Sequence, residues 1–381
     1  MRGSPLLHTV VKPRSAIFFP GQGIEYPGML SGLLKSHPSL TNDGLETLYK
    51  ALKSDEVPDA FNQISGLLTT ENPTPQDEKL IHRTSISQPA IMLSSIITLQ
   101  LANKWAEMSV ELKDERPRII QETLSDCTFM FGHSLGQVIA YVSAGVISLL
   151  EGLKIVRERG LAMESAANDT LALMNAESAS QFGMISVPIV GETVAQFVDK
   201  FTEKAKQLKD NNAIDKSSIL DVALMNSPKQ VVVSGHVAAL ETVLEEMKRR
   251  RTTKLPVRIP FHSSLLRSTE QRMRNVVSNA GIEYNWPPRK NIKIIENYSL
   301  NSIESVDGLK DSIVKGCWEP VNWVGAVDYL NEKENVSTWI GIGAGSSVSA
   351  GLVEATLGKR KGTVISIDPL KSTEGWRVIT R

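Results

Sequence analysis

The chain has 381 residues, 41% of them hydrophobic and 22% charged, which is enough for one large domain with an insert or for two domains. Its 42 Lys and Arg residues balance 42 Asp and Glu residues, so charge gives no reason to expect a nucleic-acid or anionic-membrane partner. No uninterrupted apolar run approaches the ~18 residues of a membrane span, and Cys127 and Cys317 suit neither a disulfide framework nor a metal site.

Residues 1–24 contain three basic side chains, several hydroxyl side chains and no acid. This composition is typical of a mitochondrial transit peptide, but a short N-terminal tail without a targeting role has the same features. Both interpretations stay open at this point.

The first part of the chain alternates predicted strands and helices. The stretch "SAIFF" at 15–19 predicts a buried strand that ends at Pro20-Gly21. Residues 38–87 are polar and interrupted by prolines, which favours short helices and loops, whereas residues 87–108 predict a long, mostly buried helix. A second buried strand, "TFMF" at 128–131, leads into a glycine-containing turn and another helix.

From about residue 174 the pattern becomes that of a small α+β unit. Strands are predicted at 183–187, 230–235 and 254–260, with a helical pattern in each interval. This β-α-β-α-β order predicts an inserted domain at 174–257. Strand patterns return at 291–296, 338–343 and 363–367. The predicted fold class is therefore α/β, with a large domain of residues 1–173 and 258–381 built on a parallel sheet.

The pentapeptide "GHSLG" at 132–136 follows a buried strand and precedes a helix, which is the context of a nucleophile elbow. Glycines at 132 and 136 fit because side chains two residues either side of a strained serine would collide. The helix N-terminus would offer free N–H groups to an oxyanion. Ser134 is therefore a candidate nucleophile. The alternative is a plain strand–helix turn in which Ser134 caps the helix.

A serine nucleophile needs a base, and the chain has six histidines. His133 adjoins the serine, but its side chain should leave the turn in another direction, and His236 follows a strand of the small unit. His262, in "IPFHSSLL", lies where a strand ends and a helix begins, which suits an imidazole that projects into a cleft. A structural histidine at a helix start is the alternative. Because no histidine follows His262, the late histidine of an α/β-hydrolase is missing.

Arg159 lies on the helix that follows the elbow helix. That helix opens with a capping box, Ser148 and Glu151, and the helical period places Arg159 at the edge of its apolar stripe. An inward-facing arginine needs an anion, because an unpaired buried charge is costly. The anion is either a structural Asp or Glu, or the carboxylate of a substrate.

Several motifs in this order resemble the malonyl-CoA:acyl carrier protein transacylase family, the acyltransferases of fatty acid and polyketide synthesis. They are "FFPGQG" (18–23), "SQPA" (87–90), "GHSLG", "IVRERG" (155–160), "NSPKQVVVSG" (226–235), "PFH", "EPVNW" (319–323) and "GIGAGSSVSAGL" (341–352). The resemblance extends from about Phe18 to Gly351. It implies a hydrolase-like large domain, a ferredoxin-like small domain and an active site in the cleft between them.

The resemblance also implies roles for individual residues. Ser134 matches the nucleophile, His262 the base and Arg159 the arginine that binds the free carboxylate of malonate. Gln22 matches the glutamine beside the oxyanion hole, and Leu135 supplies one N–H of that hole.

Further positions are implied around the cleft. Asn226 matches a cleft-lining asparagine, and the backbone carbonyl that orients the histidine is expected near Gly316. Phe261, before the histidine, is typical of relatives that choose malonyl over methylmalonyl groups. The chain departs from the family pattern at Gln137, where glutamate is usual, and at Leu224, where asparagine is frequent.

The implied reaction moves malonyl from malonyl-CoA to the phosphopantetheine thiol of acyl carrier protein through a serine ester, without a metal or other cofactor. A serine esterase or thioesterase, and a non-catalytic relative acting as a scaffold, are the alternatives. A free-standing enzyme of this kind belongs to a dissociated fatty-acid pathway. The basic, acid-free start favours the mitochondrial matrix, with the cytoplasm as the alternative.

Overall fold

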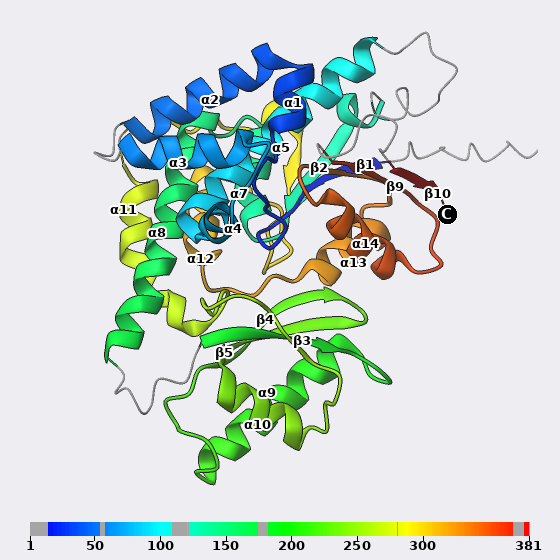
Figure 1. Ribbon diagram of the computed structural model, residues 1–381. Coiled ribbons are helices and arrows are strands. Elements are labelled where there is room, and N and C mark those ends of the chain that lie inside the picture. Colours follow the sequence, from blue (N-terminus) through cyan, green and yellow to red (C-terminus); the bar gives the residue numbers. More distant parts are fainter. Residues whose placement is uncertain are drawn as a thin grey trace, which may run out of the picture.

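The computed structural model describes residues 14–53, 58–108, 120, 122–173, 182–279, 281–368 and 377–380. It contains a six-stranded sheet and a four-stranded sheet, each with its own helices (Figure 1). Most of the basic stretch considered as a transit peptide, residues 1–13, lies outside the described residues.

The larger sheet has the strand order β10-β9-β8-β1-β2-β7. Its strands are β1 (Arg14–Phe19), β2 (Cys127–Gly132), β7 (Lys293–Ile294), β8 (Val336–Ile342), β9 (Thr363–Ile367) and β10 (Arg377–Thr380). All neighbours are parallel except β10, which runs antiparallel to β9 and was not predicted. Phe19 lies opposite Gly132 in the register, so β1 and β2 end at the same edge and their following loops meet there.

Helices cover both faces of this sheet. One side carries α1 (Ser31–Ser36), α2 (Pro38–Lys53), α3 (Pro58–Thr69), α4 (Pro75–Ile81), α5 (Thr84–Met108), α7 (Leu135–Ser143), α8 (Leu149–Leu173), α11 (Glu270–Val277) and α12 (Val306–Lys315). The other side carries α13 (Trp323–Glu332) and α14 (Ser346–Leu357). Part of the polar stretch 38–87 is more regular than predicted, because α2 is 16 residues long.

The helix α5 is the long buried helix that the sequence predicts. Its stretch Thr84–Lys104 is long and apolar enough to cross a membrane by composition, but 89% of that window is buried inside the structure. It packs against α8, which places it in the core of the large unit. Burial by neighbouring helices accounts for its hydropathy.

The smaller sheet is antiparallel, with the order β4-β5-β3-β6. Its elements are β3 (Phe182–Pro188), α9 (Val194–Asp210), β4 (Leu220–Ser227), β5 (Gln230–His236), α10 (Val237–Glu246) and β6 (Thr253–Lys254). This β-α-β-β-α-β order is ferredoxin-like. It contains one strand more than the residue pattern predicted, because β4 lacks a regular alternation. Of the strand predicted at 254–260, only its first residue belongs to β6, because Pro256 and Pro260 interrupt pairing.

The two sheets are joined by a short parallel contact between β4 and the segment that precedes α13. The amide of Met225 donates to the carbonyl of Val321 at 2.9 Å, and the amide of Val321 donates to the carbonyl of Ala223 at 2.9 Å. The smaller sheet therefore attaches to the large unit through backbone hydrogen bonds two residues after Glu319.

Candidate active site

Ser134 occupies a strained turn between β2 and α7. Its backbone has φ 52° and ψ −106°, outside the region that non-glycine residues favour. A Cβ atom on Gly132 would lie 1.9 Å from the carbonyl carbon of Gly136, and one on Gly136 would lie 2.3 Å from the carbonyl oxygen of Phe19. The expected collisions of side chains at 132 and 136 are confirmed, so the glycines permit the elbow.

His262 lies beside Ser134, the candidate nucleophile. Its Nε2 is 2.7 Å from Ser134 Oγ, and its Nδ1 is 2.7 Å from the carbonyl oxygen of Glu319. A carbonyl can only accept, so Nδ1 carries the proton and Nε2 is free to accept the proton of the serine hydroxyl. The pair has the geometry of a nucleophile and its general base.

The prediction that the orienting carbonyl lies near Gly316 is wrong by three residues. The carbonyl of Glu319 orients His262, whereas the carbonyl of Gly316 accepts from Arg159 Nη2 at 2.8 Å. Gly316 is the C-terminal cap of α12, so its carbonyl is free of the helix ladder and faces the site. Gly316 still lines the cavity beside the serine.

The surroundings of His262 keep its imidazole neutral. Burial, then the positive charge of Arg159, lowers the pKa of His262 to about 3, although its hydrogen bond to Glu319 acts in the opposite direction. Burial likewise lowers the pKa of the neighbouring His133. A neutral imidazole is the form that can accept a proton from Ser134.

Arg159 is buried, with 2% of its surface exposed, and its guanidinium reaches the nucleophile. Its Nη2 lies 3.4 Å from Ser134 Oγ and its Nη1 donates to Gln88 Oε1 at 3.1 Å. Among the described residues no carboxylate pairs with it, so the alternative of a structural Asp or Glu partner receives no support. Burial lowers the pKa of Arg159, the direction expected for a cation without a counter-ion.

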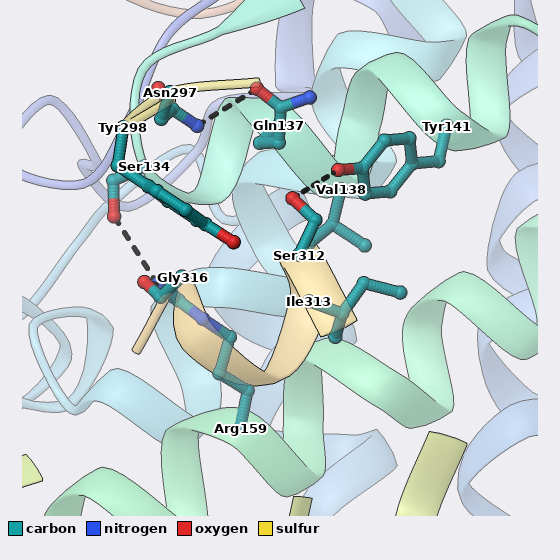
Figure 2. Close-up of a pocket in the computed structure, with 10 residues that line it drawn as sticks. All are labelled: Ser134, Gln137, Val138, Tyr141, Arg159, Asn297, Tyr298, Ser312, Ile313 and Gly316. Atoms are coloured by element: carbon teal, nitrogen blue, oxygen red, sulfur yellow. Dashed lines mark hydrogen bonds between the residues drawn. The ribbon is translucent and has the colours of Figure 1, made fainter. Parts of the chain in front are cut away.

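A small cavity opens beside these groups. Figure 2 shows the Arg159 side chain extending past Gly316 toward Ser134, with the ring of Tyr298 next to Ser134. The hydroxyl of Tyr141 donates to Ser312 Oγ at 2.8 Å on the far wall. A small cavity that borders both a candidate nucleophile and an uncompensated guanidinium suits the anionic end of an acyl group.

The predicted oxyanion hole lies where the loop after β1 meets the elbow. The amide of Leu135 starts α7 and has no acceptor among the described residues. The side chain of Gln22 is engaged elsewhere, because its Nε2 donates to Ser87 Oγ at 2.7 Å. Its backbone N–H, which also lacks an acceptor among the described residues, is therefore the group that Gln22 can contribute.

The other candidate positions, Asn226, Phe261 and His236, do not line this cavity. Asn226 Oδ1 lies 2.9 Å from His133 Nε2, so this asparagine holds the histidine next to the nucleophile and turns it away from the site. Phe261 is half-buried and packs against the core of the large unit and against the smaller sheet. His236 Nδ1 accepts from the amide of Ile219 at 2.8 Å, which is a structural role.

Residue patterns alone missed several members of the site. Glu319 acts through a carbonyl that every residue has, so its side chain gave no signal. Gln88 lies in the motif "SQPA" but had no assigned role. Asn297 donates to Gln137 Oε1 at 2.8 Å and lies, with Tyr298, directly after the predicted strand at 291–296. Their place at the end of a parallel strand could have identified them.

Comparisons with known proteins agree with this geometry, although no family model matches the chain. A malonyl CoA-acyl carrier protein transacylase from Staphylococcus aureus (strain MW2) is 27% identical over 366 residues, which cover 95% of this chain and 98% of the relative. The solved acyl-carrier-protein S-malonyltransferase from Burkholderia pseudomallei is 25% identical, with a TM-score of 0.69, and the match covers 94% of this chain and 97% of that one. A malonyl-transacylase solved in complex with its type II polyketide synthase acyl carrier protein has the same fold at 22% identity, with a TM-score of 0.69 and coverage of 93% and 95%.

Proposed function

We infer the reaction from a premise that the comparisons support: the chain belongs to the malonyl-CoA:acyl carrier protein transacylase family. It transfers the malonyl group of malonyl-CoA to the phosphopantetheine thiol of acyl carrier protein, a step of fatty acid synthesis. We propose that the malonyl group passes through an ester on Ser134, with His262 as the base and Arg159 as the group that binds the free carboxylate.

The first half-reaction forms the ester. His262 Nε2 takes the proton of the Ser134 hydroxyl, and Oγ attacks the thioester carbonyl carbon of malonyl-CoA. The backbone N–H groups of Leu135 and Gln22 stabilise the negative charge that develops on the carbonyl oxygen. The carbon–sulfur bond then breaks, and the protonated His262 returns the proton to the leaving CoA sulfur.

The second half-reaction reverses these steps with a different thiol. The phosphopantetheine thiol of acyl carrier protein enters the place left by CoA and loses its proton to His262. Its sulfur attacks the ester carbonyl, the bond to Ser134 Oγ breaks, and the serine regains a proton. Donor and product are both thioesters, so the overall exchange is close to energetic balance.

The position of Arg159 is the observation that carries this proposal. A nucleophilic serine with a histidine base would serve a hydrolase equally well. A buried guanidinium 3.4 Å from the serine oxygen, without a carboxylate partner among the described residues, instead favours an acyl group that ends in an anion. Malonyl has such an end, and acetyl does not.

Intact-protein mass spectrometry after brief mixing with malonyl-CoA tests the ester directly. We expect one malonyl adduct, located on Ser134 by peptide mapping, labile to base and discharged by addition of holo acyl carrier protein. Ser134→Ala should form none. An adduct on a different residue, or rapid release of free malonate without any need for carrier protein, would refute the assignment.

We also propose that the protein acts in the mitochondrial matrix. The proposal rests on the basic, acid-free composition of residues 1–24. Fusing residues 1–24 to a reporter protein tests it, because a transit peptide would carry the reporter into the matrix and be cleaved. A reporter that stays in the cytoplasm would favour the alternative location.

A further inference from the structure

Gln22 and Gln88 connect the loop after β1 with the guanidinium of Arg159. Gln22 Nε2 donates to Ser87 Oγ at 2.7 Å, and Gln22 Oε1 accepts from Gln88 Nε2 at 3.1 Å. Gln88 Oε1 in turn accepts from Arg159 Nη1 at 3.1 Å. Gln88 is completely buried, so its side-chain contacts are shielded from water.

The orientation of the Gln88 amide is fixed from both ends. Its Nε2 has two acceptors, Gln22 Oε1 at 3.1 Å and the Met163 sulfur at 3.7 Å. A flipped amide would direct its N–H groups at the cationic guanidinium and lose both acceptors. The oxygen of Gln88 therefore faces Arg159.

The backbones of two helices bring Gln88 within reach of Arg159. A Cβ atom on Gly160 of α8 would lie 2.6 Å from Ser85 Cα and from the carbonyl oxygen of Thr84 in α5. This close approach places the first turn of α5 against the middle of α8. The amide of Gln88 then spans the remaining gap to the guanidinium.

Among the described residues, the guanidinium makes its hydrogen bonds to uncharged groups. Gln88 holds Nη1, the Gly316 carbonyl holds Nη2 at 2.8 Å, and Ser134 Oγ lies 3.4 Å from Nη2. Neutral acceptors satisfy N–H groups and fix the plane of the group, but they leave its net charge in place. A glutamate at position 88 would make the same hydrogen bond and cancel that charge.

We propose that Gln88 is a positioning residue for malonyl selectivity: it holds Arg159 in line with Ser134 and, being neutral, leaves the guanidinium charge for the carboxylate of the substrate. The inference rests on the proposed function, because it assumes that Arg159 binds this carboxylate. It adds that the selectivity depends on an amide, as opposed to a carboxylate, at position 88.

The test compares kcat and KM for malonyl-CoA and acetyl-CoA in Gln88→Glu. We expect the malonyl-to-acetyl ratio of kcat/KM to fall at least about 10-fold, mainly through a higher KM for malonyl-CoA, because a resident carboxylate competes with the substrate for Arg159. Gln88→Leu, which removes the acceptor but adds no charge, should lower the ratio by less. It also keeps the inference testable if the glutamate variant folds poorly.

Two controls separate positioning of Arg159 from a general effect of added charge. Gln196→Glu makes the same change in the capping box of α9, in the smaller unit, so the ratio should stay within about 2-fold of wild type. In an Arg159→Ala background, Gln88→Glu should no longer change the ratio.

The inference would be overturned by an equal loss for both donors in Gln88→Glu, by an equal shift in Gln196→Glu, or by a shift that persists without Arg159. These outcomes differ from a failure of the proposed function. That failure would already be visible in the wild-type protein, as the absence of a malonyl ester on Ser134.

Discussion

Arg159 and His262 affect each other through their charges. The guanidinium helps to keep the imidazole neutral, which suits a base. Its own charge stays available because its hydrogen-bond acceptors, Gln88 and the Gly316 carbonyl, are neutral. Binding of a malonyl carboxylate would neutralise Arg159 and so ease protonation of His262 as the reaction proceeds. The chemistry of the site therefore depends on substrate charge as well as on shape.

Removing the charge of Arg159 should therefore act selectively. Truncating one partner of a buried charge pair costs about 2–5 kcal/mol, so Arg159→Ala should reduce malonyl transfer by roughly 30- to 4000-fold. Acetyl transfer should fall much less, because acetyl makes no such pair. Steady-state rates with both donors measure the difference. Arg272→Ala, which removes an exposed ion pair with Glu158, is the control and should change neither rate by more than about 2-fold.

Equal losses for both donors in Arg159→Ala, together with a lower melting temperature, would contradict this prediction. They would show that Arg159 supports the fold and does not select the substrate.

The depressed pKa of His262 predicts how acylation depends on pH. With an ordinary pKa near 6.5, only about one tenth of the imidazole would be neutral at pH 5.5. Since the pKa of His262 is lowered to about 3, the base stays neutral over this range. We expect kcat/KM for formation of the malonyl ester to change less than about 2-fold between pH 7.5 and 5.5. A fall of about tenfold toward pH 5.5, measured by rapid quench, would mean that the histidine titrates normally.

Among the elements, the contact between α5 and α8 has a strict steric requirement near the site. Gly160 provides it, since a Cβ atom there would lie 2.6 Å from backbone atoms of Thr84 and Ser85. The same contact brings Gln88 to Arg159. Packing of two helices thus determines both stability and the geometry of the carboxylate site.

Gly160→Ala should therefore lower both the stability of the protein and its selectivity for malonyl-CoA. We expect the free energy of unfolding to fall by about 1–3 kcal/mol, as in other overpacked interiors, and the malonyl-to-acetyl ratio to fall as α8 moves away. Gly351→Ala is the matched control, because that glycine lies in α14 and a Cβ atom there meets nothing within 4 Å. The free energy of unfolding of Gly351→Ala should rise by about 0.5–1 kcal/mol. If denaturant unfolding shows that both variants are more stable than wild type, α5 and α8 do not approach closely at Gly160.

At the scale of the whole molecule, the active site depends on how the smaller sheet attaches to the large unit. The segment that pairs with β4 through Val321 also supplies the Glu319 carbonyl that orients His262. Leu224 of β4 packs against apolar clusters of both units, whereas Leu220 of the same strand packs only within the small one. The two leucines allow attachment and local stability to be tested separately.

Leu224→Ala should slow formation of the malonyl ester by about 10-fold or more, because a looser junction lets the orienting carbonyl move. Leu220→Ala should lower stability to a similar extent, about 1–2 kcal/mol for a partly buried leucine, yet leave the acylation rate near that of wild type. Rapid-quench rates are compared well below the melting temperature of each variant. Equal acylation rates in the two variants would show that the junction does not affect the base.

The sequence by itself predicted the parts of this protein that depend on local chemistry. A strained serine between strand and helix requires glycines at 132 and 136, and a helical period places Arg159 at the edge of an apolar stripe. Strong apolar runs likewise predicted β1, β2, β3, β5, β8 and β9, together with the long helix α5. Each of these features depends on residues within one strand or a few helical turns, so the residue types in that segment are enough to predict it.

The tertiary structure decided what depends on partners far apart in the chain. The strand β4 has a weak pattern and is defined by its pairing with β5 and with the segment at Val321. The carbonyl that orients His262 belongs to Glu319 and not Gly316, and Gln88 faces Arg159 only because α5 and α8 approach closely. A backbone carbonyl is the same at every residue, and the charge state of a site is a sum over all its neighbours. Both are therefore properties of the folded arrangement.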